Sequence, residues 1–575
     1  MIAHRSPISG VAAFGGRFVA TAGYDNQVIL WDASTQRAVG RALHDHLANQ
    51  VDFSPDGRYL ASASSDYTAR IWTVPDLKLH TVLSDHLDDV EMVVFHPVRD
   101  LVATASRDHR IRIYDLDGNL VRCFIGHQAD VISVVWSSCG NYLISSSDDG
   151  TVKRWSLDSG NLVADVDVGG VETDTIAIDA AGSIYAGNDE GNILVILDGC
   201  VTTIHAHTAG IKRLVYNAHE SLLVSLSYDR SMCVWRIGET LERITSAALP
   251  AEVWARSCAF IDGRTLAFAT FGSSYAVYHI GSATWDLSNV RPTAGVNAVA
   301  LHEGQRMTIG DSGVFAIDGR PVTNLGSLCN FIAPTDAHIF TGGQLGQVMS
   351  ALSGEILYHH HSPLNCGVAF VRDRQTHVII GAYTGEGLIF RGGPDGRVSH
   401  VATLRLHSNA VKSVSVSDGV IFSVCADKSA SWFSVDTFEE IARLEDAHGR
   451  IANGSAALPR QRFVSVSRDR KMRIWQKGGA QMIDTPHQRS IKCVATSPDG
   501  RYIASGSYSG VVAIYDMIEA RWVAENRPTA SGISSICSGL VPGTFLMGSY
   551  DGHVYELDVV AQPSIGARYA ESQPA

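Results

Sequence analysis

A segment of about 41 residues repeats along the whole chain, and no other feature constrains the fold as strongly. Each copy starts with a polar stretch containing His and continues with a β-rich, Ser-rich part. It then reaches an Asp that an aromatic residue follows six positions later. One copy reads GHQADVISVVWSSCGNYLISSSDDGTVKRW, with His127, Asp149 and Trp155. Since its apolar and polar residues alternate in short runs, each copy is predicted to be a four-stranded sheet.

The Asp position can be followed through fourteen copies. In order, it is occupied by Asp25, Asp66, Asp108, Asp149, Glu190, Asp229, Gly272, Asp311, Leu345, Thr384, Asp427, Asp469, Ser509 and Asp551. Rings of such sheets close with about four to eight blades, so fourteen copies divide most naturally into two rings of seven. The predicted fold class is all-β, with two tandem seven-bladed β-propellers made of fourteen four-stranded blades. The first propeller is expected over residues 1–285 and the second over residues 286–575.

The aromatic residue is followed by Asp in several copies, for example in Trp31-Asp32, Tyr114-Asp115 and Tyr515-Asp516. With these dipeptides the sequence resembles the WD40 repeat family over essentially its whole length. The resemblance is strongest in units 1 to 4, 6, 12 and 13, and weakest in units 5 and 7 to 10, where Gly272 and Leu345 replace the Asp.

The resemblance implies a buried hydrogen-bond network in each blade, which joins a loop His, the turn Asp, a strand hydroxyl and the Trp nitrogen. Loss of one member would leave its partners unsatisfied, at a cost of about 1–3 kcal/mol. We therefore interpret these side chains as structural. Carried over to this sequence, they are His44, Asp66 and Trp72; His86 and Asp108; His127, Asp149 and Trp155; His207, Asp229 and Trp235; and His448, Asp469 and Trp475.

Only Met1 to Ala3 precede the first repeat, which is too short for a strand of typical length. We therefore expect every blade to run from its innermost to its outermost strand in chain order, with rings that close by packing. The outer strand of unit 7 is expected within Ser282–Val290, which includes the decoy dipeptide Trp285-Asp286. The outer strand of unit 14 is expected within Ser564–Ala570.

Composition narrows the possible functions. The net charge is −13, and the acidity lies in residues 1–285, with 33 Asp or Glu against 21 Lys or Arg, whereas residues 286–575 have 26 against 25. This balance disfavours a protein that mainly neutralises phosphates. The ten cysteines form no C-x-x-C pair, and the start lacks a signal peptide, so a cytoplasmic protein without cofactor or metal is expected.

Three local patterns could carry chemistry, but each has a simpler explanation. A metal site at His359–His361 is disfavoured because neighbouring strand residues point to opposite faces, and His361 is interpreted as the loop His of unit 10. A nucleophile pair of Cys366 with His361 lacks a third orienting group. The basic stretch from Arg460 to Arg473 is interpreted as a solvated turn and strand face, with a phosphopeptide or nucleic-acid site as the alternative.

Binding residues are expected on loops, because a rigid scaffold presents them there. The residue before the turn Asp is often Tyr or Arg, types that are enriched in binding hot spots. These residues are Tyr24, Arg107, Tyr228, Arg468, Tyr508 and Tyr550. Beside the innermost strands, Asp89 and Asp130 of the first ring contrast with Lys412 and Lys492 of the second, although Lys212 breaks the pattern. Two faces of different sign suggest two partners.

The predicted function is a non-catalytic scaffold or recognition subunit that binds one or more proteins in a stable complex. No catalytic, cofactor-binding or metal-binding residue is assigned. Membranes, nucleic acids and small molecules are not expected as partners. Two alternatives stay open: a propeller enzyme, either a hydrolase or a lyase with a central-channel site, and an actin-regulating double propeller such as actin-interacting protein.

Overall fold

The computed structural model describes residues 2–393, 397–476, 479–559 and 568–569. All strands in these residues belong to fourteen four-stranded antiparallel sheets, and each sheet uses four strands that follow one another in the chain, from β1–β4 to β53–β56. This arrangement confirms the prediction of an all-β chain with fourteen blades.

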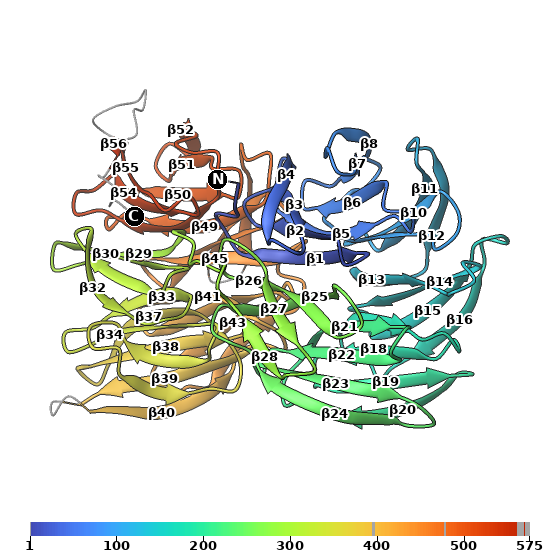
Figure 1. Cartoon of the computed structure of the whole chain (residues 1–575). Helices are drawn as coiled ribbons and strands as arrows, with labels where there is room; N and C mark the ends of the chain where they lie inside the picture. The colour runs from blue at the N-terminus through green and yellow to red at the C-terminus, as the bar shows by residue number, and fades with distance from the viewer. Residues whose placement is uncertain (1, 394–396, 477–478, 560–567, 570–575) are drawn as a thin grey trace. The chain divides into compact units, whose positions relative to one another are not determined.

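The contacts divide the chain into two compact units, Met1–Pro292 and Thr293–Ala575, with seven sheets in each (Figure 1). In both units the first strand of each sheet lies nearest the centre of the ring. In the first unit these are β1 (Ile8–Phe14), β5 (Ala48–Phe53), β9 (Val90–Phe95), β13 (Val131–Trp136), β17 (Thr173–Ile178), β21 (Ile211–Asn217) and β25 (Val253–Phe260). In the second they are β29 (Val296–His302), β33 (Cys329–Pro334), β37 (Leu364–Arg372), β41 (Val411–Ser417), β45 (Ala452–Leu458), β49 (Ile491–Thr496) and β53 (Ile533–Ser538).

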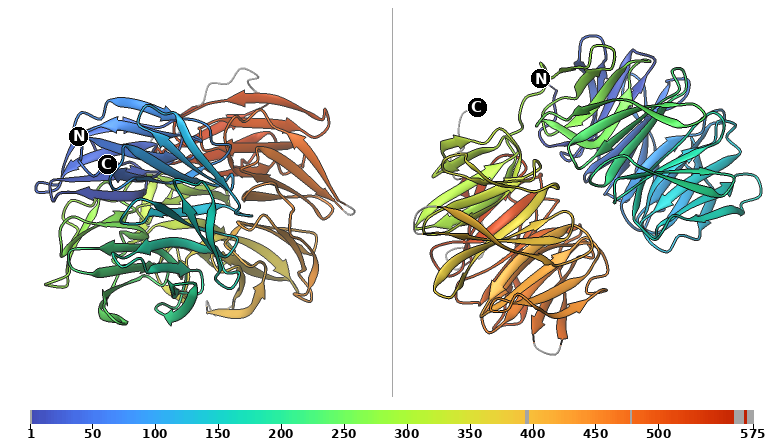
Figure 2. Two further views of the ribbon diagram at one scale, coloured as in Figure 1. Left: turned by 90° about the vertical axis from the view of Figure 1, so that its right-hand side faces the viewer. Right: turned by 90° about the horizontal axis from the view of Figure 1, so that it is seen from below.

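Each ring closes by packing between its first and last blades. In the first unit β1 lies beside both β5 and β25, and the Val11 amide donates a 3.0 Å hydrogen bond to Ser257 Oγ. In the second unit β29 lies beside both β33 and β53, and the Val299 amide donates a 3.3 Å hydrogen bond to Ser535 Oγ. No sheet of the described residues borrows a strand from the other end of its ring, and the blades can be followed in Figure 2.

The last blade of each unit obtains its outer strand from the residues that follow it. In blade 7, β28 (Thr284–Asp286) pairs with β27 (Ala276–His279), and the Trp285 ring packs 4.8 Å from that of Tyr278. The predicted domain boundary after residue 285 therefore falls inside β28. In blade 14, β56 (Arg568–Tyr569) pairs with β55 (Val554–Asp558). Of the predicted strand region Ser564–Ala570, residues 564–567 and 570 lie outside the described residues.

Blade 4 shows why these sequences form blades. Of its two middle strands, β14 (Tyr142–Ser147) carries mainly small or aliphatic residues that are buried on both faces. In β15 (Thr151–Ser156) each residue is buried or half-buried. The outermost strand, β16 (Leu162–Asp167), alternates between exposed and half-buried residues because only one of its faces is covered. The turn between the middle strands ends at Gly150, with φ of +72°, where a Cβ atom would lie 2.5 Å from the backbone of Gly170.

The loops of each ring lie on two faces. The loop before each innermost strand and the turn between the second and third strands lie at the same end of an antiparallel sheet. We call the face that carries these loops, with the repeat Asp on its turns, the Asp face. The turns between the first and second strands and between the third and fourth strands form the opposite face.

The loop His of unit 10 is His360, and the prediction of His361 is wrong. The His360 amide donates a 2.8 Å hydrogen bond to Gly346 O, the carbonyl that follows the turn position of unit 9. The loop residues His207 and His407 make the same contact with Gly191 and Gly385. The turn of unit 10 holds Thr384 instead of Asp, so the imidazole of His360 hydrogen-bonds to Ser362. A loop of different length explains why spacing alone selected the wrong residue.

Candidate partner-binding faces

The His, Asp and Trp side chains of blade 4 form one buried network. The two ring nitrogens of His127 lie 2.8 Å from Asp149 Oδ2 and 2.8 Å from Ser145 Oγ, and Trp155 Nε1 donates to the same hydroxyl at 2.9 Å. Blade 2 joins His44, Asp66 and Trp72 in the same way, and blade 6 joins His207, Asp229 and Trp235. In these blades His and Asp hold the sheet together, since every polar atom has a partner.

Blades 3 and 12 use the same positions differently. Asp108 forms an ion pair with Arg112 at 2.8 Å, and Asp469 forms one with Arg473 at 2.7 Å. The Nδ1 atoms of His86 and His448 are buried without a hydrogen-bond partner, and burial lowers the pKa of both to about 4. The predicted His86–Asp108 and His448–Asp469 bonds are therefore not formed. In both blades an Arg four residues after the Asp binds the carboxylate in place of the imidazole, through a charge-assisted contact.

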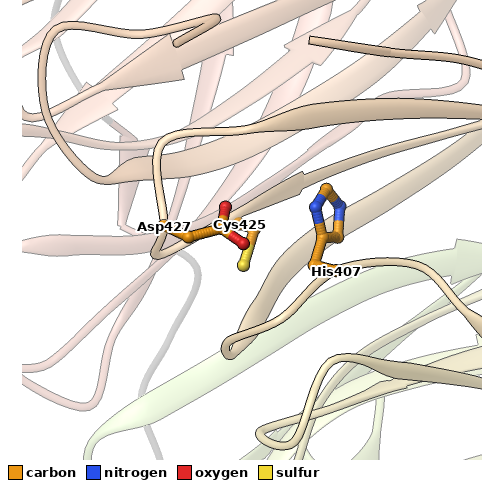
Figure 3. Close-up of side chains that lie close together, drawn as sticks. All are labelled: His407, Cys425 and Asp427. Carbon is orange, nitrogen blue, oxygen red and sulfur yellow. The ribbon is translucent and has the colours of Figure 1, made fainter. Parts of the chain in front are cut away.

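Of the described residues, only His407, Cys425 and Asp427 form a cluster with metal-ligand atoms within 4.8 Å of one another (Figure 3). Their arrangement matches the blade network. The imidazole of His407 contacts Ser429 Oγ at 2.6 Å and Ser423 Oγ at 2.8 Å. Asp427 accepts from the amides of Ser408 and Ser429, and Cys425 stands where blade 4 has Ser147. Burial raises the pKa of the Cys425 thiol, which disfavours the thiolate that a metal would need.

We expect Cys425→Ser to leave the structure and stability of the second unit essentially unchanged, within about 1 kcal/mol, because serine is the residue of seven other blades, including blades 12 to 14 of the same ring. Zinc should not raise the melting temperature of either protein, which calorimetry with and without one equivalent of zinc measures. A zinc-dependent rise in the wild type that the variant loses would instead identify a metal site.

A buried carboxyl group on an innermost strand of the first ring, Asp52 of β5, bears on the enzyme alternative. Burial raises the pKa of Asp52 to about 7, and its Oδ2 accepts a 2.8 Å hydrogen bond from the Phe95 amide. Burial also lowers the pKa of Arg213 and raises that of the Cys258 thiol to about 12. A protonated thiol is a poor nucleophile, so these groups make a weak catalytic set.

The other two candidate sites also lose their chemical basis. Burial raises the pKa of Cys366 to about 12, and its sulfur lies 4.0 Å from Val411 O. In the basic stretch, Arg473 binds Asp469, Lys471 binds Asp484, and Arg462 Nε donates to Pro459 O at 3.2 Å. These contacts agree with the interpretation as a turn and strand face.

On the Asp face of the first ring, Arg107 lies between acidic side chains. Its Nε contacts Glu91 at 2.5 Å and its Nη1 contacts Asp130 at 2.6 Å. Lys212, the exception to the charge pattern, forms ion pairs with Asp174 and Asp189. Both cations are therefore matched by more than one carboxylate, and the face remains rich in acid.

Sequence reasoning missed Asp148 and Asp189, which stand directly before the turn positions of units 4 and 5. Burial and the neighbouring carboxylates of Glu172, Asp130 and Asp174 raise the pKa of Asp148. Their position in the repeat could have identified them, because they occupy the same turn position as Arg107. They were missed because only Tyr and Arg residues were considered at that position.

Aromatic side chains lie on the same face. The rings of Tyr24 and Trp254 meet edge to face at 5.3 Å, and the Arg256 guanidinium lies 5.7 Å from the Trp254 ring. Lys212 Nζ lies 5.0 Å from the Tyr228 ring. Asp89, in contrast, is 1% exposed and accepts a 3.1 Å hydrogen bond from Ser65 Oγ, so the structure does not place it as a surface contact.

One position explains much of the difference between blades: the second residue of the innermost strand. Where it is Asn, its side-chain amide donates to a backbone carbonyl of the next innermost strand and joins the two blades. These pairs are Asn49–Val90 (2.9 Å), Asn297–Cys329 (3.1 Å), Asn330–Leu364 (2.8 Å), Asn365–Val411 (2.8 Å) and Asn453–Ile491 (2.7 Å). Five of the fourteen blades thus use this position for structure.

Other blades carry a charge there instead, and among them are Lys412 and Lys492 of the second ring. Lys412 Nζ lies 5.1 Å from the Tyr383 ring, and Lys492 Nζ lies 6.0 Å from the Tyr508 ring. Arg468 and Tyr550 stand on turns of the same face, and both are half-buried. The predicted residues of the second ring therefore gather on one face, where lysines lie over aromatic rings.

A family model described as "WD domain, G-beta repeat" matches residues 1–32, 40–73, 77–115, 118–156, 198–236 and 481–516. The chain is a WD40 repeat protein. The matched segments correspond to blades 1 to 4, 6 and 13, and the strong resemblance expected in unit 12 lies outside them.

Several known proteins are similar to parts of this chain. Transcription initiation factor TFIID subunit 5 of Caenorhabditis elegans is 33% identical over 164 residues, which cover 28% of this chain and 25% of that protein. Transcriptional corepressor LEUNIG_HOMOLOG of Arabidopsis thaliana is 24% identical over 39% of this chain and 34% of its own length. WD repeat-containing protein 1 of Gallus gallus is 33% identical over 25% of this chain and 24% of its own. The chain thus spans between a quarter and about a third of these relatives.

In the part of the chain that the structure describes, no helix has the length and apolar character needed to cross a membrane.

Proposed function

We propose that this WD40 repeat protein is a non-catalytic, cytoplasmic scaffold or recognition subunit whose rings bind other proteins in a stable complex through their Asp faces. The second residue of the innermost strand carries the proposal. Asparagine there joins blades, whereas Lys412 and Lys492 place a charge over an aromatic ring at the same position. A charge at a position with a better structural residue available indicates selection for recognition.

The Asp face of the first ring and the Asp face of the second ring differ in charge, which supports partners of opposite charge. The first offers Glu91, Asp130 and Asp174 beside tyrosine and tryptophan, which suits a basic segment. The second offers Lys412 and Lys492 over tyrosine rings, which suits an acidic segment. Aromatic and charged side chains of this kind dominate binding energies in protein interfaces. One relative is named as a subunit and another as a corepressor, and both names agree with a role within protein complexes.

The experiment is affinity purification of the full chain followed by mass spectrometry of the co-purifying proteins. A stoichiometric companion is expected with the wild type. The double variant Lys412→Asn, Lys492→Asn introduces the residue of the neighbouring blades, so folding should persist while recovery of the second-ring companion falls at least about tenfold.

The matched control removes two positive charges from outer strands of the same ring, through Arg320→Asn in β32 (Arg320–Asn324) and Arg521→Asn in β52 (Arg521–Asn526). It should retain the companion. Equal loss in both double variants would show a nonspecific charge effect and contradict the proposal. Turnover of a substrate by the isolated chain would favour the enzyme alternative, and co-sedimentation with filamentous actin would favour the actin alternative.

A further inference from the structure

A cavity of about 190 Å³ lies between blades 4 and 5 of the first ring. Its rim is formed by Ser137–Cys139, between β13 and β14, and by Ala180–Gly182, between β17 and β18 (Ile184–Asn188). Both turns join a first to a second strand, so the cavity opens on the opposite face. It is therefore independent of the binding surfaces in the proposed function.

Arg154 lines this cavity, and it differs from the residues at the equivalent position in the other blades of the ring. It stands on β15 directly across from Ile144, five residues after the turn Asp. In most other blades of this ring the equivalent residue is aliphatic and at most 5% exposed, where it packs against the next blade. These residues are Leu30, Ile71, Ile113, Val234 and Val277. An aliphatic side chain would suit the interface between blades 4 and 5 equally well.

The guanidinium of Arg154 contacts no acid. Its Cζ lies 3.9 Å from the centre of the Tyr142 ring, and its Nε is buried without a hydrogen-bond partner. Among the described residues, the side chain makes neither a hydrogen bond nor an ion pair. A buried donor of this kind costs about 1–3 kcal/mol when unsatisfied. A residue kept at such a cost indicates that something else satisfies it.

The remaining walls define the occupant. Ile144, Ile178 and Ile184 line the same cavity with apolar side chains. A water molecule occupies about 30 Å³ of the liquid, so the cavity holds a group about six times larger. It is smaller than the roughly 300–1,000 Å³ sites that enclose drug-sized molecules. The space suits one planar anion, which a guanidinium binds in a bidentate manner, with a few methyl or methylene groups.

We propose that this cavity binds a carboxylate carried on a short branched aliphatic group. The carboxylate pairs with Arg154, and the aliphatic part packs on the isoleucines. Two sources have this chemistry: the C-terminal residue of a partner protein that ends in valine or leucine, and a free short-chain acid. In both cases the group that carries the carboxylate is small enough to fit the cavity.

Cys139 gives a direct readout, since it is exposed and lines the mouth of the cavity. Its sulfur lies 3.4 Å from Ser137 Oγ, and this hydrogen bond lowers the pKa of the thiol, which favours alkylation. Cys123 and Cys200 are also exposed but do not line the cavity, so they serve as controls in the same sample. Iodoacetamide labelling of the full chain, quantified by mass spectrometry, measures all three rates.

The probes are acetyl-Gly-Ser-Gly-Ala-Val with a free carboxylate, the same peptide as its C-terminal amide, and isovalerate, each at up to about 10 mM, which detects millimolar affinity. We expect the free-acid peptide to slow alkylation of Cys139 at least threefold, with Cys123 and Cys200 unchanged and the amide without effect. Equal protection by isovalerate supports the carboxylate site and identifies a free acid as sufficient. Stronger protection by the peptide identifies a chain terminus.

Arg154→Leu supplies the residue of blade 1 and should abolish protection while the first unit melts at the same or a higher temperature. Because Arg154 also acts on the Cys139 thiol, each variant is judged by its own ratio of rates with and without probe. Arg154→Lys, which keeps the charge but not the fork, should protect weakly. Protection that persists in Arg154→Leu, equal protection by the amide, or no protection by either acid would each overturn the proposal.

Discussion

Replacing Trp155 with alanine is expected to lower the free energy of unfolding of the first unit by about 3–5 kcal/mol, the range for large aromatic residues in cores. The indole is 3% exposed, stacks on Phe124 at 5.1 Å between ring centres, and donates to Ser145 Oγ at 2.9 Å. The substitution removes packing and deprives Ser145 Oγ of the hydrogen bond that the indole donates, while His127 keeps Ser145 and Asp149. Scanning calorimetry of the full chain should show a shift in the transition of the first unit only.

Two conservative variants separate packing from hydrogen bonding. Trp155→Phe keeps most of the aromatic surface and should cost about 1–2 kcal/mol, the value of the lost bond. Tyr278 occupies the equivalent position in blade 7, and its buried hydroxyl has no hydrogen-bond partner. Tyr278→Phe should therefore change stability by less than about 0.5 kcal/mol. A larger loss in Tyr278→Phe than in Trp155→Phe would contradict the network.

Asp229→Ala is expected to destabilise the first unit by about 1–3 kcal/mol, and Asp149→Ala by a similar amount. Asp229 accepts hydrogen bonds from the Thr208 amide at 3.0 Å and the Ser231 amide at 2.9 Å, and it pairs with His207 at 3.1 Å. Its removal deprives the two amides of their acceptor and breaks the pair with His207, whose Nδ1 retains only Ser231 Oγ at 2.9 Å. The control Asp158→Ala removes a carboxylate that is 73% exposed and should cost less than about 0.5 kcal/mol. Equal melting of the wild type and both network variants would contradict the assignment.

The cost of Asp229→Ala should depend on pH in a defined direction. Burial alone would raise the pKa of Asp229, but hydrogen bonds from His207 and Ser231 hold it at about 2, below the ordinary 3.8. Burial alone would lower the pKa of His207, but Asp229 raises it from 6.5 to about 9. The depressed carboxyl stabilises above pH 3.8 and loses this effect as the pH falls to about 2. The raised imidazole stabilises below pH 6.5 and loses its effect as the pH rises through about 9.

The difference between wild type and Asp229→Ala is therefore expected to be largest between pH 4 and 6.5 and smaller above about pH 9. Denaturant unfolding at pH 6 and at pH 9.5, under conditions where the two units are resolved, measures it. A difference that grows at the higher pH would contradict the ion pair between His207 and Asp229.

The fold was predictable because the repeat is a local signal that recurs fourteen times. The turn Asp and the aromatic residue six positions later place the second and third strands even in blade 7, where Gly272 stands in for the Asp. The networks of blades 3 and 12 were not predictable from this pattern. Arg112 and Arg473 follow the Asp by four residues, as Arg70 does in blade 2, yet only in blade 2 does the His keep its bond to the Asp. The outcome depends on side-chain geometry that spacing does not encode.

The candidate sites, too, were predictable from the sequence in part. Half-burial of Lys412 and Lys492 on a ring face follows from their position in the repeat, whereas the burial of Asp89 depends on Ser65 from the neighbouring blade. The cavity at Arg154 arises between two blades, and lining residues from different blades are at least 24 residues apart in sequence, which is beyond any local pattern.

Ring closure without strand exchange makes the seam between the first and last blades chemically similar to every other junction. At the seam, β1 and β25 meet through side chains and the Val11–Ser257 bond, much as β17 and β21 meet through a 2.9 Å bond from the Leu214 amide to Thr175 Oγ. Among the described residues, the seam uses the same kind of side-chain contact as an ordinary junction, and the four strands of each blade are consecutive in the chain. Such a ring can in principle be cut in any loop between blades and rejoined at its natural ends, which makes circular permutation a route to moving the termini away from a face of interest.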